Sequence, residues 1–293
     1  MSESIVITGA EGSPYSRKLR ALLRFRRIPY RWVHQGSPEA RDLPQPRVSL
    51  LPQLVLRDAA GALVAKTDTT PLIRELEERC PERSVVPDDP ALAMLDALLE
   101  DYADEWLTKA MYHFRWAHEA DIANASRLLP SWFRPDQPDE AIARAGESFA
   151  ARQIERRAVV GSNETTRPVI EQSYERLLRA LDAHLAASRF VLGARPARCD
   201  FALYGQLTQL VRVDPTPARI AHATSLRTVA WVDLCEDLSG LELASRGWLA
   251  PDALPATLRA LLEEAGRTYA PFLLANARAL EADADEVVCT IDG

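Results

Sequence analysis

The first 80 residues alternate between short apolar runs and stretches with helical periodicity. Apolar side chains are continuous at residues 5–7 of a run that ends at Thr8, recur on one helical face at 14–27, and alternate with polar side chains at 30–34. Continuous and alternating runs are typical of strands, whereas a 3.6-residue period is typical of a helix. The pattern therefore predicts a strand, a helix and a second strand.

A second group of elements follows a Pro-rich connector at residues 36–46. Residues 51–57 and 62–66 read as strands, and Asp-Ala-Ala-Gly at 58–61 reads as the hairpin turn between them. A helix is predicted at residues 70–80. The order βαβ–ββα predicts a small α/β domain in which an antiparallel hairpin is added to a parallel crossover.

From residue 89 onward the strand signals give way to helical periodicity, after a linker at residues 84–90 (Ser-Val-Val-Pro-Asp-Asp-Pro). We expect an all-helical second half without a repeat of fixed period. The predicted helices are 91–120, 138–159, 168–187, 198–212, 226–238, 255–265 and 267–282.

Composition supports two ordinary globular domains in a chain of 293 residues, of which 47% are hydrophobic. The apolar run at residues 5–7 is far shorter than the ~7 to 15 residues of a signal-peptide core, and no stretch approaches ~18 apolar residues. We therefore expect a cytoplasmic protein that does not span a membrane.

The net charge and the spacing of cysteines and histidines argue against nucleic-acid binding, a disulfide framework and a metal site. The net charge of −7 disfavours binding to nucleic acid. The four cysteines are far apart, which predicts neither a disulfide framework nor a cysteine-based zinc site. His113 and His118 are five residues apart rather than four, without a further ligand nearby in the sequence, so no metal site is expected.

Ser13 and Pro14 form a typical helix start. A serine hydroxyl at the N-cap accepts a free backbone N–H, and proline in the first turn lacks the N–H that would stay unpaired. From these two residues alone, Ser13 is interpreted as a helix cap.

Several motifs together resemble the glutathione transferases. They are residues 13–18 (Ser-Pro-Tyr-Ser-Arg-Lys), Leu51-Pro52 at the third strand, Asp68-Thr69 at the last helix of the domain, and the glycine-plus-aspartate helix start at 193–205. The resemblance implies a thioredoxin-like glutathione-binding domain at residues 1–84 and an all-helical C-terminal domain at 90–293. Residues 100–116 suggest a bacterial-type branch whose substrates are not indicated.

The resemblance implies that Ser13 binds the sulfur of glutathione, because Ser13 matches the serine that holds the thiolate in serine-type members. Hydrogen bonds to an ionised thiol lower its pKa from ~8.5 towards neutrality, and the N-terminus of a helix favours negative charge. Neither residue 13 nor residue 16 is a cysteine, so the chain cannot form the mixed disulfide of glutaredoxin chemistry. The reacting thiol must therefore come from a ligand.

The same resemblance implies the other contacts of glutathione. Pro52 would be cis, with the backbone of Leu51 binding the cysteinyl part, and Asp68 and Thr69 would bind the γ-glutamyl end. Leu50 departs from the family, which often has a polar or basic residue there for the glycyl end. Arg47 or His34 could replace that contact.

A second-substrate pocket would include Tyr15 and part of the aromatic helix that faces the loop in the family. The candidates on that helix are Tyr112, His113 and Trp116. Aromatic residues at helical spacing are also typical of a core, so both interpretations stay open.

The function implied is a glutathione transferase: a homodimeric enzyme that activates the thiol of glutathione for attack on an apolar electrophile, without a metal. The alternative is a non-catalytic member of the same fold that binds apolar ligands or a partner protein. Leu50 and the enlarged helical domain favour that alternative.

Overall fold

The structure, a computed structural model, describes residues 5–243 and 247–292. Its sheet has the strand order β2–β1–β3–β4, and the strands are β1 (Ile5–Gly9), β2 (Tyr30–His34), β3 (Gln53–Arg57) and β4 (Leu63–Lys66). β1 is parallel to β2 and antiparallel to β3, which is antiparallel to β4. The predicted parallel crossover with an antiparallel hairpin is confirmed.

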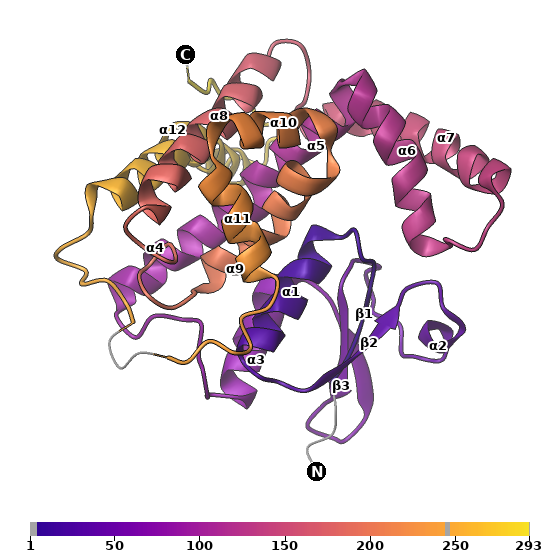
Figure 1. The fold of residues 1–293 in the computed structure, drawn as a ribbon, viewed down its shortest axis with the longest axis horizontal. Coiled ribbons are helices and arrows are strands. Elements are labelled where there is room, and N and C mark those ends of the chain that lie inside the picture. The colour runs from indigo at the N-terminus through magenta and orange to yellow at the C-terminus, as the bar shows by residue number, and fades with distance from the viewer. Residues whose placement is uncertain (1–4, 244–246, 293) are drawn as a thin grey trace.

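Two helices, α1 (Pro14–Phe25) and α3 (Thr69–Arg79), lie on the face of the sheet that is turned towards the helical part of the chain (Figure 1). The predicted connector after β2 contains a short helix, α2 (Pro38–Arg41), on the other side of the sheet. Ser37 caps α2 by accepting from the backbone N–H of Ala40, as Ser13 caps α1.

The remainder of the described chain is helical. Its elements are α4 (Pro90–Asp101), the π-helical η1 (Tyr102–Leu107), α5 (Thr108–Ala117), α6 (Glu119–Phe133), α7 (Asp139–Glu155), the 3₁₀ turn η2 (Arg156–Ala158), α8 (Arg167–Leu185), α9 (Arg198–Thr208), the π-helical η3 (Gln209–Val213), α10 (Pro215–Thr224), α11 (Leu226–Cys235) and α12 (Ala256–Glu281).

The predicted helix 91–120 is in fact a helical run from α4 through α5, followed by a separate helix. The run ends at Ala117, because His118 is extended (φ −109°, ψ 133°) and turns the chain into α6. α6 was missed beyond residue 120, since Pro130 lies inside it. The predicted helices 255–265 and 267–282 form one helix, α12, which continues through Gly266.

α6 and α7 pack against each other and project from the helical part on the side where β1, β2 and α2 lie (Figure 1). Their close approach depends on Gly146, since a Cβ there would overlap the backbone of Ser126. The pair therefore forms a closely packed wall beside the N-terminal domain.

One hydrophobic cluster extends from the sheet domain into the helical part, and a buried ionic contact crosses the same boundary. The Lys18 ammonium of α1 is 0% exposed and lies 2.8 Å from Glu100 Oε1 and 2.5 Å from Asp104 Oδ2. Burial alone would lower the pKa of Lys18, but the two carboxylates outweigh it and the pKa is raised. The charged cluster fixes α1 against α4 and η1.

None of the helices in the described part of the chain is long and apolar enough to cross a membrane.

Candidate functional site

Ser13 is the N-cap of α1, as predicted. Its backbone is extended (φ −82°, ψ 121°), and its Oγ accepts from the backbone N–H of Ser16 at 3.2 Å. Capping uses a lone pair of the hydroxyl, so the O–H hydrogen can still be donated to a ligand. Ser13 thus presents a donor at the positive end of a helix.

The Leu51–Pro52 peptide bond is cis, as predicted. It precedes β3, which pairs with β1, the strand that leads into the Ser13 loop. Leu51 and Ser13 line the same cavity, so the two parts of the sequence motif meet at one place.

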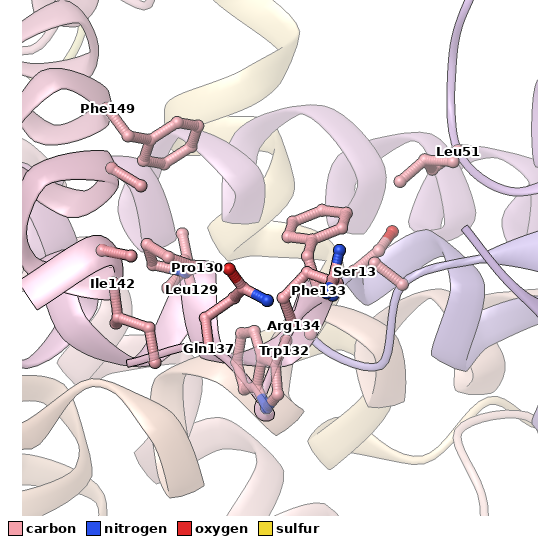
Figure 2. A pocket seen from close by; sticks show the side chains of 14 residues that line it. Ser13, Leu51, Leu129, Pro130, Trp132, Phe133, Arg134, Gln137, Ile142 and Phe149 are labelled. Carbon is pink, nitrogen blue, oxygen red and sulfur yellow. The ribbon is translucent and has the colours of Figure 1, made fainter. Parts of the chain in front are cut away.

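This cavity, of about 530 Å³, lies between the Ser13 loop and the α6–α7 pair (Figure 2). Most of its lining is apolar, and the polar side chains there are Ser13, Arg134 and Gln137. The apolar wall comprises Leu129, Pro130, Trp132, Phe133, Ile142, Ala145 and Phe149, among others. We call it the apolar cavity.

A second cavity of about 450 Å³ shares Leu51 with the first. We call it the acidic groove because four carboxylic acids line it: Asp68, Asp101, Asp104 and Glu105. Tyr15, Leu50, Thr69, Thr70 and Pro71 complete the described lining. Of the predicted site residues, the structure therefore brings Leu51, Asp68, Thr69 and Tyr15 together.

Asp68 adopts a left-handed backbone conformation (φ 74°) and caps α3 by accepting from the backbone N–H of Thr70 at 3.2 Å. Such a conformation is uncommon for a non-glycine residue and costs about 1–3 kcal/mol. Its side chain is exposed, whereas Thr69 is buried. The strained turn therefore directs a carboxylate towards the groove.

The charge of the groove is strongly one-sided. Burial raises the pKa of Asp104 to about 6, although the adjacent Lys18 opposes the shift. Burial, followed by the charges of Asp101 and Asp68, raises the pKa of Glu105. No lysine or arginine is among the described residues that line the groove. It therefore favours an ammonium group and disfavours a carboxylate.

His34 and Arg47, the two residues proposed to replace the missing polar contact at Leu50, lie in different surroundings. His34 Nε2 is 2.7 Å from the backbone oxygen of Trp132, so this imidazole is hydrogen-bonded to α6. Arg47 is exposed, and Leu50 is 51% exposed. His34 therefore holds the wall of the apolar cavity instead of the glycyl end of a ligand.

Tyr15 joins α1 to the helical part. Its hydroxyl donates to the backbone oxygen of Asp104 at 2.8 Å and lies 3.0 Å from Thr108 Oγ1. Burial raises the pKa of Tyr15, so the phenol stays neutral. Tyr15 is a wall of the groove whose hydroxyl already has partners.

The remaining pocket candidates, Tyr112, His113 and Trp116, do not line the apolar cavity or the acidic groove. Tyr112 donates to the backbone oxygen of Gln153, and Trp116 is 2% exposed with its ring against Phe149. Their prediction as lining beside Ser13 is wrong, because α6 and α7 supply that wall.

Sequence reasoning missed the aromatic residues that do line the apolar cavity. Leu129, Trp132 and Phe133 have helical spacing, as do Ile142 and Phe149. The spacing of the first group was a usable signal, but Pro130 within it argued against a helix.

The prediction that His113 and His118 have no further metal-ligating residue near them is also wrong. Glu171 of α8, distant in sequence, lies beside both His113 and His118. The three residues form a cluster of metal-ligating type apart from both cavities.

Residues 7–84 match the family model "Glutathione S-transferase, N-terminal domain". None of the curated proteins searched matches the chain.

Several solved structures align with most of the chain at low identity. A glutathione S-transferase from Methylobacterium radiotolerans, in complex with glutathione sulfonate, is 17% identical with a TM-score of 0.44, covering 83% of this chain and 99% of its own. A maleylacetoacetate isomerase from Anaeromyxobacter dehalogenans with bound GSH is 18% identical (TM-score 0.41; 79% and 94% covered). FzlA from C. crescentus is 17% identical (TM-score 0.48; 85% and 96% covered). The match to the family model covers residues 7–84, so the sheet-containing N-terminal part of this chain is similar to the N-terminal domain of the glutathione S-transferases.

Proposed function

We propose that this protein is a glutathione-dependent transferase that acts on an apolar electrophile. The observation that supports the proposal is the position of Ser13, a free hydroxyl donor at the N-terminus of α1 in the wall of the apolar cavity. Leu51, which lines both the apolar cavity and the acidic groove, connects the place for glutathione with the place for a second substrate.

In this proposal the acidic groove holds the γ-glutamyl end of glutathione. Its ammonium group meets the carboxylate of Asp68, and the backbone of Leu51, ahead of the cis-proline, binds the cysteinyl part. The sulfur then lies at the N-terminus of α1, where the Ser13 hydroxyl and the helix dipole stabilise the thiolate.

The reaction requires no covalent intermediate on the protein. The thiol loses its proton to solvent, and the thiolate sulfur forms a bond to the electrophilic carbon of a molecule in the apolar cavity. The bond from that carbon to the leaving group breaks, and the leaving group departs with the electron pair, as chloride does from a chloronitrobenzene. Catalysis comes from the raised thiolate fraction and from holding the two reactants together.

Ser13→Ala tests this role, and the chain offers a matched control. Ser37→Ala removes a hydroxyl from the same Ser-Pro helix start at α2, away from both cavities. We expect Ser13→Ala to lower the turnover of a chloronitrobenzene substrate by about 10²- to 10³-fold. The variant should also raise the pKa of the thiol of bound glutathione, which the absorbance of the thiolate measures. Ser37→Ala should change neither. Equal turnover in wild type and Ser13→Ala would refute the assignment.

A second candidate function is the binding of an apolar ligand without chemistry. The charge of the acidic groove favours it, because glutathione carries two carboxylates and the described lining offers them no lysine or arginine. Retention on immobilised glutathione separates the candidates. If glutathione at millimolar concentration does not bind while an apolar dye still does, the result supports ligand binding without chemistry and excludes the transferase.

The proposal also includes a homodimer and a cytoplasmic location. Both rest on the family resemblance. Sedimentation equilibrium of the purified protein gives the oligomeric state, and cell fractionation gives the location.

A further inference from the structure

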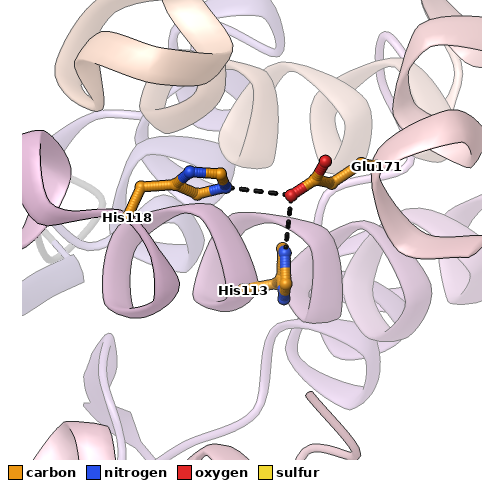
Figure 3. Close-up of side chains that lie close together, drawn as sticks. All are labelled: His113, His118 and Glu171. Atoms are coloured by element: carbon orange, nitrogen blue, oxygen red, sulfur yellow. Dashed lines mark hydrogen bonds and ion pairs between the residues drawn. The ribbon is translucent and has the colours of Figure 1, made fainter. Parts of the chain in front are cut away.

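Two histidines and a glutamate converge at the end of α5 (Figure 3). His113 Nε2 lies 3.1 Å from Glu171 Oε1, and His118 Nε2 lies 3.0 Å from the same oxygen. One ligand atom from each residue falls within 4.8 Å of the others. α8 contributes Glu171, and the extended backbone of His118 turns its ring back over the helix that carries His113.

We propose that His113, His118 and Glu171 bind a divalent transition-metal ion, and that zinc fits this set of ligands best. Two imidazoles and one carboxylate are borderline ligands, which zinc prefers over the hard oxygen sets of magnesium and calcium. The cluster lies outside the apolar cavity and the acidic groove, so the proposal stands independently of glutathione chemistry.

The spacing of the ligand atoms suits such an ion. Ligands at ~2.0 to 2.1 Å from a tetrahedral zinc are separated from each other by about 3.3 Å. The two nitrogen–oxygen separations of 3.0 and 3.1 Å need only a few tenths of an ångström of expansion. Two of the three ligand-atom separations are therefore already close to those of a metal site, and the third, between the two imidazole nitrogens, is at most 4.8 Å.

The orientation of His113 is already fixed. Its Nδ1 lies 2.8 Å from Ser162 Oγ, and its ring is fully buried. A hydroxyl can donate or accept, so Ser162 can satisfy Nδ1 in either tautomer and leave Nε2 unprotonated for the metal.

Access and the remaining coordination position lie on the side of His118 and Glu171. Their side chains are 26% and 30% exposed, whereas that of His113 is 0% exposed. Three protein ligands with one face open to solvent leave a fourth position for water.

Nearby positive charge weakens the site but does not block it. Arg167 Nε lies 3.5 Å from Glu171 Oε1, and Arg157 Nε donates to Ser162 Oγ at 3.3 Å. Both guanidinium groups are attached to flexible side chains at the edge of the cluster. A bound ion would take over the Oε1 atom, and Arg167 would then pair with Glu164, which it already contacts at 3.0 Å.

The test uses the full chain, freed of metal with a chelator, and Co²⁺ as a spectroscopic probe. We expect one Co²⁺ per chain, with visible d–d bands typical of nitrogen and oxygen ligands in a coordination number below six. Zn²⁺ should displace the Co²⁺ and abolish the bands.

Variants identify the ligands. Glu171→Gln and His118→Asn should each remove the bands or weaken binding by more than ten-fold, and Ser162→Ala should weaken it by about 10- to 100-fold. His222→Asn, on the exposed face of α10, is the control and should bind as wild type does. Circular dichroism before metal is added shows that each variant is folded.

Two outcomes would overturn the proposal. One is a wild-type spectrum of octahedral, water-bound Co²⁺ only. The other is the same affinity in wild type, Glu171→Gln and His118→Asn, which would mean that the metal binds elsewhere.

Discussion

The hydroxyl of Tyr15, in the first turn of α1, donates to the backbone oxygen of Asp104 in η1 at 2.8 Å. Two segments 89 residues apart in the chain are thereby joined two residues after Ser13. The hydrogen bond connects the helix that would hold the thiolate with the wall of the acidic groove.

Tyr15→Phe should therefore destabilise the protein by about 1 kcal/mol, the usual value of one buried hydrogen bond. It should also raise KM for glutathione more than it lowers kcat, since Tyr15 lines the groove without activating the thiol. Tyr112→Phe, which loses a hydroxyl bonded to Gln153, is the control for stability alone. A loss of turnover in Tyr15→Phe as large as that of Ser13→Ala would show that Tyr15 is the activating residue.

Gly205 lies where α9 meets the start of α1, and a Cβ there would come within 2.6 Å of the Pro14 backbone oxygen. Gly205→Ala should push the Ser13 turn outward, cost about 1–3 kcal/mol of stability and reduce turnover. Gly266→Ala is the matched substitution inside α12, where nothing lies within 4 Å. It should stabilise the protein by up to about 1 kcal/mol. Unfolding in urea measures the change in the free energy of unfolding for both variants. Equal changes in Gly205→Ala and Gly266→Ala would contradict the predicted contact with Pro14.

The buried carboxyl of Asp104 should make stability depend on pH. Its pKa of about 6 in the folded protein exceeds the ordinary 3.8, so the folded state binds more protons between these values. Stability from this group is therefore lost as the pH rises from about 4 through 6, by an amount on the order of 3 kcal/mol.

The comparison with Asp104→Asn isolates that contribution, because the amide does not titrate. The free energy of unfolding of wild type, relative to this variant, should fall between about pH 4 and about pH 7. A difference that is constant or rises over this range would show that Lys18 keeps Asp104 ionised throughout.

The size of the apolar cavity should control the binding of apolar ligands. Ala145 of α7 lines it, and Ala145→Phe would fill part of its volume of about 530 Å³. We expect weaker binding of an apolar fluorescent dye and unchanged retention on glutathione. Ala143→Phe, on the exposed face of the same helix, should leave both unchanged. Full dye binding in Ala145→Phe would mean that the dye site lies elsewhere.

The sequence was most informative where local chemistry determines the structure. The Ser13-Pro14 cap and the alternation of the strands depend on residues adjacent in the chain, and both were predicted. The cis-Leu51–Pro52 bond was predicted from the family resemblance. The helix boundaries were displaced where a proline or glycine was tolerated, as at Pro130 in α6 and Gly266 in α12. Tertiary packing determines the boundaries of these two helices, and local helix propensity contains no information about that packing.

The candidate sites were predictable to different degrees for the same reason. Asp68 and Thr69 could be placed in the groove from a motif, whereas the wall formed by Trp132 and Phe133 required knowledge that α6 folds towards the Ser13 loop. Glu171 lies 53 residues from His118 in sequence, and only the packing of α8 against α5 brings them together. A spacing rule for histidines on one helix could not detect that contact.

Gly12 immediately precedes Ser13, and a Cβ at this position would overlap the ring of Trp132. The indole therefore rests on main-chain atoms, and the floor of the apolar cavity is set by the backbone of the loop that carries Ser13. Substitutions along α7 can change the width of the cavity while its depth stays the same. A ligand selected by such changes would still meet the Ser13 hydroxyl at an unchanged height. In the proposed transferase, the range of apolar ligands can therefore change without a change in the residue that holds the thiolate.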